Sequence, residues 1–185
     1  MQYVLASTSP RRKELLKQLI SDFEIISPDV DESYAHILGC EQLVCDLAER
    51  KCAAVFAKNP QKTVIAADTV VVYGGRVLGK PKSENDAVQT LKTLSGREHS
   101  VITGVCVQSP YNKVVGFNKT TVKFNILSDE FIKNYVKGGS PMDKAGSYGI
   151  QDKGVVCGYA GSYSNVVGLP LGLTRELLEK AEKHQ

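Results

Sequence analysis

The chain lacks the glycine-rich phosphate loops of the common nucleotide-binding folds. Its 185 residues contain neither a Gly-x4-Gly-Lys-Ser/Thr segment nor a Gly-x-Gly-x-x-Gly fingerprint. Both patterns place backbone N–H groups around a phosphate at the start of a helix. Their absence argues against a P-loop NTPase and against a Rossmann dinucleotide site.

Other common signatures are missing as well. The three histidines have no metal-ligand spacing, and there is no Gly-x-Ser-x-Gly elbow of a serine hydrolase. The five cysteines form no Cys-x-x-Cys pair and are odd in number, which indicates neither a disulfide framework nor a zinc site. Reduced core thiols are typical of cytosolic proteins, so we expect a cytoplasmic location.

No segment predicts secretion or a membrane span. The sequence opens in a strand-like run, MQYVLA, without the basic and apolar regions of a signal peptide. Residues 154–174 carry no charge, but they contain five glycines, Pro170 and several polar residues. A spanning helix needs about 20 apolar residues. We therefore predict a buried, glycine-rich loop here and no membrane partner.

The charge balance is only mildly basic. A formal net charge of +3 and a pI near 8.5 fall short of the dense Lys/Arg footprint of a nucleic-acid binder. A small anionic ligand fits this balance better than nucleic acid does.

Strand-like and helix-like segments alternate along the chain. Apolar or alternating runs predict strands at 2–6, 23–27, 63–68, 99–109 and 113–126. Helical spacing and capping residues predict helices at 10–20, 41–57, 83–94, 128–138 and from Pro170 onward. The Gly74-Gly75 pair predicts a hairpin, which excludes an all-parallel sheet. We therefore expect an α/β fold with a mixed sheet flanked by helices, in one domain over residues 1–185.

The stretch ASTSPRR, residues 6–12, combines a helix start with charges of the wrong sign. Ser9 followed by proline predicts the beginning of a helix. Arg11 and Arg12 then stand where the positive end of the helix dipole favours acidic residues. The plain explanation is a solvated basic turn. We favour a phosphate chain as the missing anion, held by these arginines and by the hydroxyl of Ser7.

Three further polar positions belong to strand ends or loops. Asp68 ends the predicted strand 63–68 and should emerge at its tip, where α/β proteins place ligand sites. Lys80, in GKP, follows the predicted hairpin, and Glu32 lies in an acidic loop. Each has a plain alternative, a turn cap for Asp68 and a solvated charge for the other two. Glu32 and Asp68 are our candidate ligands for a divalent cation.

Together these segments resemble the Maf family of nucleoside triphosphate pyrophosphatases, historically called septum formation proteins. Seven motifs occur in the family's order along the whole chain: LASTSPRR at 5–12, LAERK at 47–51, AADTVV at 66–71, GKP at 79–81, LSGREHSVITGV at 94–105, PMDKAGSYGIQ at 141–151 and GSYSNVVGLPL at 161–171.

The resemblance implies a fold and a reaction. The fold would be the elongated mixed α/β fold of the inosine triphosphate pyrophosphatases, also called Ham1-like, with two lobes around a cleft. The reaction would be cleavage between the α and β phosphates of a nucleoside triphosphate, giving the monophosphate and pyrophosphate, with Mg²⁺ or Mn²⁺ as cofactor. A housecleaning role, a link to arrest of cell division and a homodimer are also implied by the family alone.

The resemblance also assigns roles to residues by motif. Asp68 would be the general base. The residues implied to bind the triphosphate are Ser7, Arg11, Arg12, Lys51 and Lys80. In the subgroup that acts on dTTP and UTP, base selection is attributed to the positions of Arg12, Thr69 and Gln151.

Two positions depart from the family pattern. The alanine that often follows the lysine of LAERK is Cys52, and the glycine that usually follows GIQ is Asp152. Asp152 adds a carboxylate beside a predicted triphosphate site.

Two alternatives to the pyrimidine nucleotide pyrophosphatase remain. One is a non-catalytic nucleotide- or DNA-binding regulator of septum formation, which would need no general base. The other is an ITP or XTP pyrophosphatase on the related fold, which the ADT and GIQ elements disfavour.

Overall fold

The computed structural model describes residues 2–32 and 39–183, and the chain separates into two compact units. Unit 1 comprises Met1–Thr69, Thr103–Asn118 and Ser164–Gln185, and unit 2 comprises Val70–Ile102 and Lys119–Tyr163. Each unit is thus assembled from segments that are far apart in the sequence.

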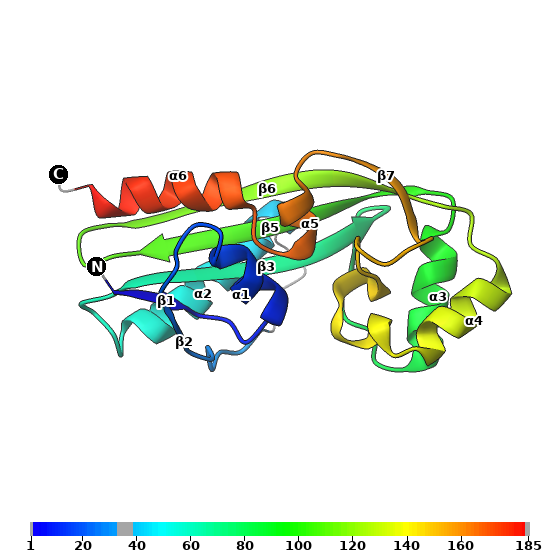
Figure 1. Cartoon of the computed structure of the whole chain (residues 1–185), viewed down its shortest axis with the longest axis horizontal. Helices are drawn as coiled ribbons and strands as arrows, with labels where there is room; N and C mark the ends of the chain where they lie inside the picture. Colours follow the sequence, from blue (N-terminus) through cyan, green and yellow to red (C-terminus); the bar gives the residue numbers. More distant parts are fainter. Residues whose placement is uncertain (1, 33–38, 184–185) are drawn as a thin grey trace. The chain divides into compact units, whose positions relative to one another are not determined.

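The described strands form a seven-stranded mixed sheet (Figure 1). They are β1 (Tyr3–Leu5), β2 (Glu24–Ile25), β3 (Thr63–Tyr73), β4 (Arg76–Leu78), β5 (Glu98–Gln108), β6 (Lys113–Phe124) and β7 (Val156–Ala160). Their order is β2-β1-β3-β5-β6-β7, and β4 pairs with β3. β1 is parallel to β2 and β3, whereas β3–β4 and β6–β7 are antiparallel, which confirms the predicted mixed sheet.

Local capping fixes the start of three helices. The helices are α1 (Pro10–Leu16), α2 (Cys40–Phe56), α3 (Glu84–Leu94), α4 (Asp129–Lys137), α5 (Tyr163–Val167) and α6 (Leu171–Glu182), with short 3-10 helices η1 (Ser140–Asp143) and η2 (Ala145–Ser147). The hydroxyls of Ser9, Ser83 and Ser128 each accept a hydrogen bond from the backbone N–H three residues later. These contacts confirm the three predicted helix starts.

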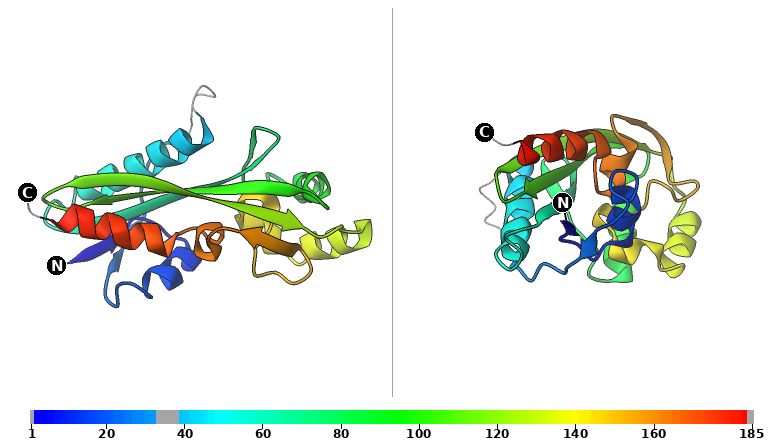
Figure 2. Two further views of the ribbon diagram at one scale, coloured as in Figure 1. Left: turned by 90° about the horizontal axis from the view of Figure 1, so that it is seen from above. Right: turned by 60° about the vertical axis from the view of Figure 1, so that its left-hand side comes forward.

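In unit 1 the sheet is covered on both faces (Figure 2). Alternate strand residues such as Leu5 and Ile65 pack with the apolar faces of α1 and α6. Their neighbours, such as Val4 and Val64, pack with α2. Because successive strand residues point to opposite faces, this alternation confirms that the run at 63–67 is buried on both sides.

A glycine permits the closest approach between α2 and the sheet. A Cβ at Gly104 of β5 would lie 2.3 Å from the carbonyl oxygen of Val44 in α2. No side chain fits in that space, so this glycine of the predicted LSGREHSVITGV motif has a packing role.

The end of α1 and the segment 154–174 differ from the prediction. α1 ends at Leu16 rather than near residue 20, because the chain tightens into bonds from Gln18 N to Leu15 O and from Leu19 N to Leu16 O. The predicted buried loop at 154–174 contains β7 and α5. β7 has little apolar pattern because it lies at the edge of the sheet, with Tyr159 half exposed, and is held by its pairing with β6.

The cysteines are free thiols, as predicted. Cys52 and Cys106 are buried core residues, but Cys157 is exposed, so the prediction of core thiols is wrong at that position. Over residues 2–32 and 39–183, we find no helix long and apolar enough to cross a membrane.

The prediction of a single domain over residues 1–185 stays a prediction. The elongated shape and the cleft between two lobes also stay predictions, since they concern the placement of the two units relative to one another.

Candidate functional site

Asp68 and Thr69 lie in the middle of β3, not at its tip. The strand was predicted to end at residue 68, but it continues to Tyr73. The neighbouring strand β1 is much shorter, and its pairing with β3 ends where Leu5 faces Ile65. The prediction that Asp68 emerges at a strand tip is therefore wrong, although Asp68 lies beyond the carboxyl end of the neighbouring strand β1.

Lys51 holds two carboxylates on the α2 side of β3. Its Nζ lies 2.6 Å from Oδ1 of Asp68 and 2.8 Å from Oε1 of Glu32. The side chains of Lys51 and Asp68 are 7% and 11% exposed, whereas that of Glu32 is 63% exposed. The structure thus brings together the predicted base, a predicted phosphate-binding lysine and the second candidate metal ligand.

Arg12 forms a second group with residues of unit 1. Its Nε donates to the carbonyl oxygen of Gly168 at 2.9 Å, and its Nη2 donates to Oγ1 of Thr69 at 3.1 Å. Its Nη1 reaches Oγ of Ser7 at 3.4 Å. The guanidinium at the start of α1 therefore binds three oxygens, two from the distant residues Gly168 and Thr69 and one from the nearby Ser7.

Burial lowers the pKa of the Arg12 guanidinium below its ordinary value. The negative charges of Asp68 and Glu32 oppose this shift, and the neighbouring Arg11, half-buried in the first turn of α1, adds to it. A guanidinium is not deprotonated in proteins, so Arg12 keeps its charge at neutral pH.

Thr69 belongs to a directed chain of hydrogen bonds. Oγ1 of Thr103 donates to the carbonyl oxygen of Asn165 at 2.9 Å, so it must accept the bond that joins it to Oγ1 of Thr69 at 3.0 Å. Thr69 then donates to Thr103 and accepts from Arg12. Both side chains are thereby held in one orientation.

Thr103, Asn165 and Gly168 were not predicted as site residues. Their residue types indicate no role. Only their place in the motifs at 94–105 and 161–171 could have pointed to them. Asn165 and Gly168 contribute backbone carbonyl groups, which no sequence pattern identifies.

The two groups lie on opposite sides of β3. Asp68 contacts Lys51 of α2, and Thr69 contacts Arg12 of α1. This follows from the alternation of side chains along a strand. Within the ADT element, Asp68 thus pairs with an ammonium on one face of the sheet, and Thr69 binds an arginine on the other.

Lys80 and Gln151 belong to unit 2. Lys80 is exposed in the turn after β4, and the backbone N–H of Gly146 donates to the carbonyl oxygen of Gly79 at 3.1 Å. Gln151 is exposed in a turn that follows Gly149. The segment 144–152 therefore carries Gln151 and also fastens the turn that carries Lys80.

His99 is a buried structural residue of unit 2. It is buried, its Nε2 lies 2.7 Å from the hydroxyl of Tyr148, and its ring packs edge-on against Phe124 with centroids 5.0 Å apart. Burial lowers the pKa of His99 from 6.5 to about 4. The imidazole is therefore neutral at physiological pH.

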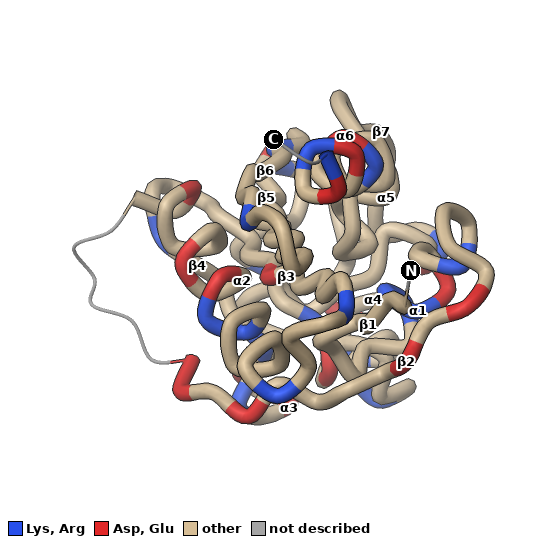
Figure 3. Tube along the Cα trace, turned by 90° about the vertical axis from the view of Figure 1, so that its left-hand side faces the viewer, with Lys and Arg blue, Asp and Glu red and all other residues tan. Residues whose placement is uncertain are grey.

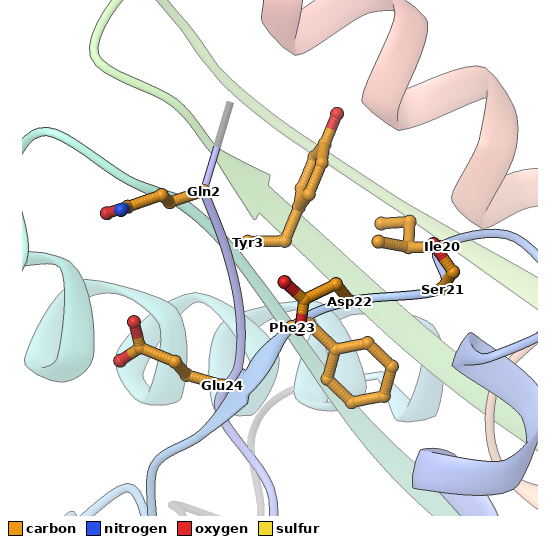
Figure 4. Close-up of a pocket in the computed structure, with 7 residues that line it drawn as sticks. All are labelled: Gln2, Tyr3, Ile20, Ser21, Asp22, Phe23 and Glu24. Carbon is orange, nitrogen blue, oxygen red and sulfur yellow. The ribbon is translucent and has the colours of Figure 1, made fainter.

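A pocket of about 310 Å³ lies elsewhere in unit 1 (Figure 4). Its described lining comes from Gln2, Tyr3 and residues 20–24 and includes none of the predicted site residues. Asp22 and Glu24 contribute carboxylates to it, and Glu24 is paired with Lys62 at 2.6 Å. An acidic lining of this kind is unsuited to a triphosphate.

The two predicted metal ligands share the ammonium of Lys51. The carboxylates of Glu32 and Asp68 converge on the same Nζ, within 2.6–2.8 Å. Across the described ranges 2–32 and 39–183, no group of three or more His, Cys, Asp or Glu residues forms a metal cage. Two converging carboxylates fit Mg²⁺, which takes its remaining ligands from water and substrate phosphates.

Comparison with known proteins decides the family. The family model described as Maf-like protein matches residues 2–181. The chain belongs to the Maf family. The dTTP/UTP pyrophosphatase of Carboxydothermus hydrogenoformans is 50% identical over 184 residues, covering 97% of this chain and 98% of that protein. The dTTP/UTP pyrophosphatase of a Geobacillus strain is 47% identical over 175 residues, covering 94% of each.

Solved structures of Ham1 proteins resemble this Maf-family chain in fold. The Staphylococcus aureus Ham1 protein matches with a TM-score of 0.54 and 18% identity, covering 98% of this chain and 100% of that one. A Ham1 protein from Coxiella burnetii matches with a TM-score of 0.51 and 16% identity over the same shares. The expected Ham1-like fold is confirmed.

Proposed function

We propose that the chain hydrolyses dTTP and UTP to the nucleoside monophosphates and pyrophosphate. Relatives at 42–50% identity that match nearly end to end carry the name dTTP/UTP pyrophosphatase. The observation that carries the proposal is the buried pair of Lys51 and Asp68, joined at 2.6 Å beside Glu32. A buried carboxylate held by an ammonium is a suitable base at the edge of a phosphate site.

Asp68 orients the attacking water. Lys51 binds Oδ1, so Oδ2 is the oxygen that we assign to the water. The water attacks the α-phosphorus, its proton passes to the Asp68 carboxylate, and the bond from the α-phosphorus to the bridging oxygen breaks to release pyrophosphate. Catalysis of phosphoryl transfer depends mainly on such positioning and on neutralisation of charge.

The cations bind the triphosphate. Lys51, Arg11, Arg12 and Lys80 carry the positive charges that the phosphate oxygens require. Ser7, 6% exposed, adds a hydroxyl beside Arg12. Lys51 is shared between Asp68 and Glu32, so a phosphate oxygen can replace the exposed Glu32 while the bond to Asp68 remains.

A divalent cation, Mg²⁺ or Mn²⁺, would be held by Glu32 and Asp68. When bound, it supplies charge neutralisation and acidifies the attacking water.

Base selection is assigned to Arg12, Thr69 and Gln151. A guanidinium can only donate hydrogen bonds, so Arg12 favours the O4 carbonyl of uracil or thymine over the amino group of cytosine. Thr69 fixes the orientation of Arg12 through the bond to Nη2. The amide of Gln151 carries both a donor and an acceptor for the base edge.

The direct test is a panel of nucleoside triphosphates. Purified protein with Mg²⁺ or Mn²⁺ is incubated with dTTP, UTP, CTP, GTP and ITP, and pyrophosphate and monophosphate are measured. We expect release mainly from dTTP and UTP. Asp68→Asn should bind these nucleotides and lose most turnover. No release from any nucleotide would refute the proposal, and release mainly from ITP would refute the pyrimidine assignment.

The alternative of a DNA-binding regulator makes a different prediction. It requires binding with a steep salt dependence, because Lys/Arg contacts to phosphates release counterions. Acidic and basic residues are interspersed along the trace (Figure 3), and the net charge is only +3. These features favour the enzyme. A homodimer, a cytoplasmic location and a role in cell division stay predictions.

A further inference from the structure

Asp152 is the centre of a polar cluster in unit 2. Its Oδ2 accepts hydrogen bonds from the hydroxyl of Tyr135 in α4, from Oγ of Ser140 at 2.9 Å and from the backbone N–H of Gly149 at 3.2 Å. One carboxylate oxygen thus joins α4, the start of η1 and the turn that contains Gln151.

The cluster extends in both directions from Asp152. Nζ of Lys144 donates to Oγ of Ser140 at 3.3 Å, which brings a cation to the far side of that hydroxyl. The hydroxyl of Tyr135 also accepts from Gly149 N at 3.2 Å, and Asp152 N donates to Gly149 O at 3.0 Å. The turn at 149–152 is therefore closed by its own backbone and fastened to α4 from outside.

Gln151 packs directly against the fastened backbone. A Cβ at Gly149 would lie 2.6 Å from Nε2 of Gln151 and 2.9 Å from Oδ2 of Asp152. The amide of Gln151 thus rests on the bare Cα of Gly149, which is itself held by Asp152 and Tyr135. Gln151 remains exposed, so its amide can meet a ligand.

We propose that Asp152 is a positioning residue for nucleotide selection: it fastens the 149–152 turn so that the Gln151 amide meets the base in one orientation. The proposal rests on the proposed function, because it deepens the role of Gln151 there. It also gives a role to the carboxylate that replaces the usual glycine after GIQ. The position shows no left-handed backbone, so the aspartate fits without strain.

The first test is the ratio of kcat/KM for dTTP to that for CTP. We expect Asp152→Ala to lower this ratio about five-fold, which is the factor for loss of one neutral hydrogen bond between the Gln151 amide and the base. The loss should appear in KM, with little change in kcat. Asp152→Asn keeps an acceptor oxygen and should retain most of the ratio. Glu130→Ala removes an exposed carboxylate of α4, the helix that carries Tyr135, and should leave the ratio unchanged.

Two further variants separate positioning from general stability. Gly149→Ala keeps the residues Asp152 and Gln151, but its Cβ would displace the Gln151 amide and press on Oδ2 of Asp152, so it should lower the ratio as Asp152→Ala does. In a Gln151→Ala background, Asp152→Ala should change the ratio less than two-fold, because a residue that acts through Gln151 has nothing left to position.

A measurement without nucleotide tests the fastening itself. Burial and the bond to Asp152 raise the pKa of Tyr135. Tyr135→Phe identifies its contribution to the ultraviolet titration of tyrosinate, and Asp152→Ala should move that contribution to lower pH. An unmoved titration would overturn the fastening.

The outcomes distinguish the two proposals. Absence of hydrolysis in the wild-type chain refutes the proposed function and the specificity role with it. Hydrolysis of dTTP by the wild type, together with an unchanged dTTP to CTP ratio in folded Asp152→Ala and Gly149→Ala, refutes the role of Asp152 alone. Additive effects of Asp152→Ala and Gln151→Ala would also refute it.

Discussion

Replacement of Lys51 by methionine tests whether burial or distance sets the strength of an ion pair in this chain. Lys51 and Asp68 are 2.6 Å apart with side chains 7% and 11% exposed. Lys180 and Glu176 on α6 are also 2.6 Å apart, but their side chains are 55% and 57% exposed. The two pairs therefore differ in burial at equal distance, and both belong to unit 1.

Lys51→Met leaves the Asp68 carboxylate buried without its ammonium. Breaking a buried pair by removal of one partner costs about 3–5 kcal/mol. Arg12 still attracts Asp68, so we expect a loss of about 3 kcal/mol, the lower end of that range. Lys180→Met should cost about 0.2–1 kcal/mol, because water screens the exposed pair.

Urea unfolding followed by circular dichroism measures both losses through the shift of the midpoint at unchanged slope. The double variant Lys51→Met/Asp68→Asn should recover most of the stability, because no buried charge is left uncompensated. Equal losses for Lys51→Met and Lys180→Met would refute the reasoning. A double variant less stable than Lys51→Met would refute it as well.

Three other predictions concern particular side chains. Thr69→Val removes the acceptor of Arg12 Nη2 and should lower the preference for dTTP over CTP about ten-fold, with kcat nearly unchanged, in steady-state kinetics. The pKa of His99 is about 4 when folded and 6.5 when unfolded, so its contribution to stability is complete above pH 6.5. About 3 kcal/mol of this stability is lost as the pH falls from 6.5 to 4. In a plot of the urea midpoint against pH, His99→Gln should therefore reduce the slope between pH 4 and 6.5. Gly104→Ala meets a backbone carbonyl and should cost about 3 kcal/mol or more. Gly116→Ala has its closest contact with the flexible side chain of Leu173, at 3.1 Å, and should cost less than about 1 kcal/mol; comparable losses in urea unfolding would contradict this account.

Features decided within a few residues were predictable from the sequence. Ser9, Ser83 and Ser128 cap their helices as predicted, since a cap involves only residues three positions apart. The Gly74-Gly75 hairpin also forms, with both residues at positive φ, as the tight turn between β3 and β4 requires.

Features decided between distant segments were not predictable. β7 is a strand because β6 offers a partner, and its own residues carry no strand pattern. Asp68 lies beyond the end of the neighbouring strand because β1 is short, and residues 63–68 do not encode the length of β1. The bond from Arg12 to the carbonyl oxygen of Gly168 spans 156 positions, so the helix dipole argument identified an unusual arginine without its partner.

The interleaving of the two units decides what can be removed from this protein. Unit 1 needs both the first and the last segment of the chain, and unit 2 is interrupted by Thr103–Asn118 of unit 1. No contiguous fragment can therefore contain unit 1 without the whole of unit 2. During synthesis, Leu177 and Leu178 of α6 are made after the whole of unit 2, so the face of Leu5 and Ile65 that they cover stays open until then. A truncation before α6 should accordingly yield an aggregating polypeptide rather than a smaller enzyme.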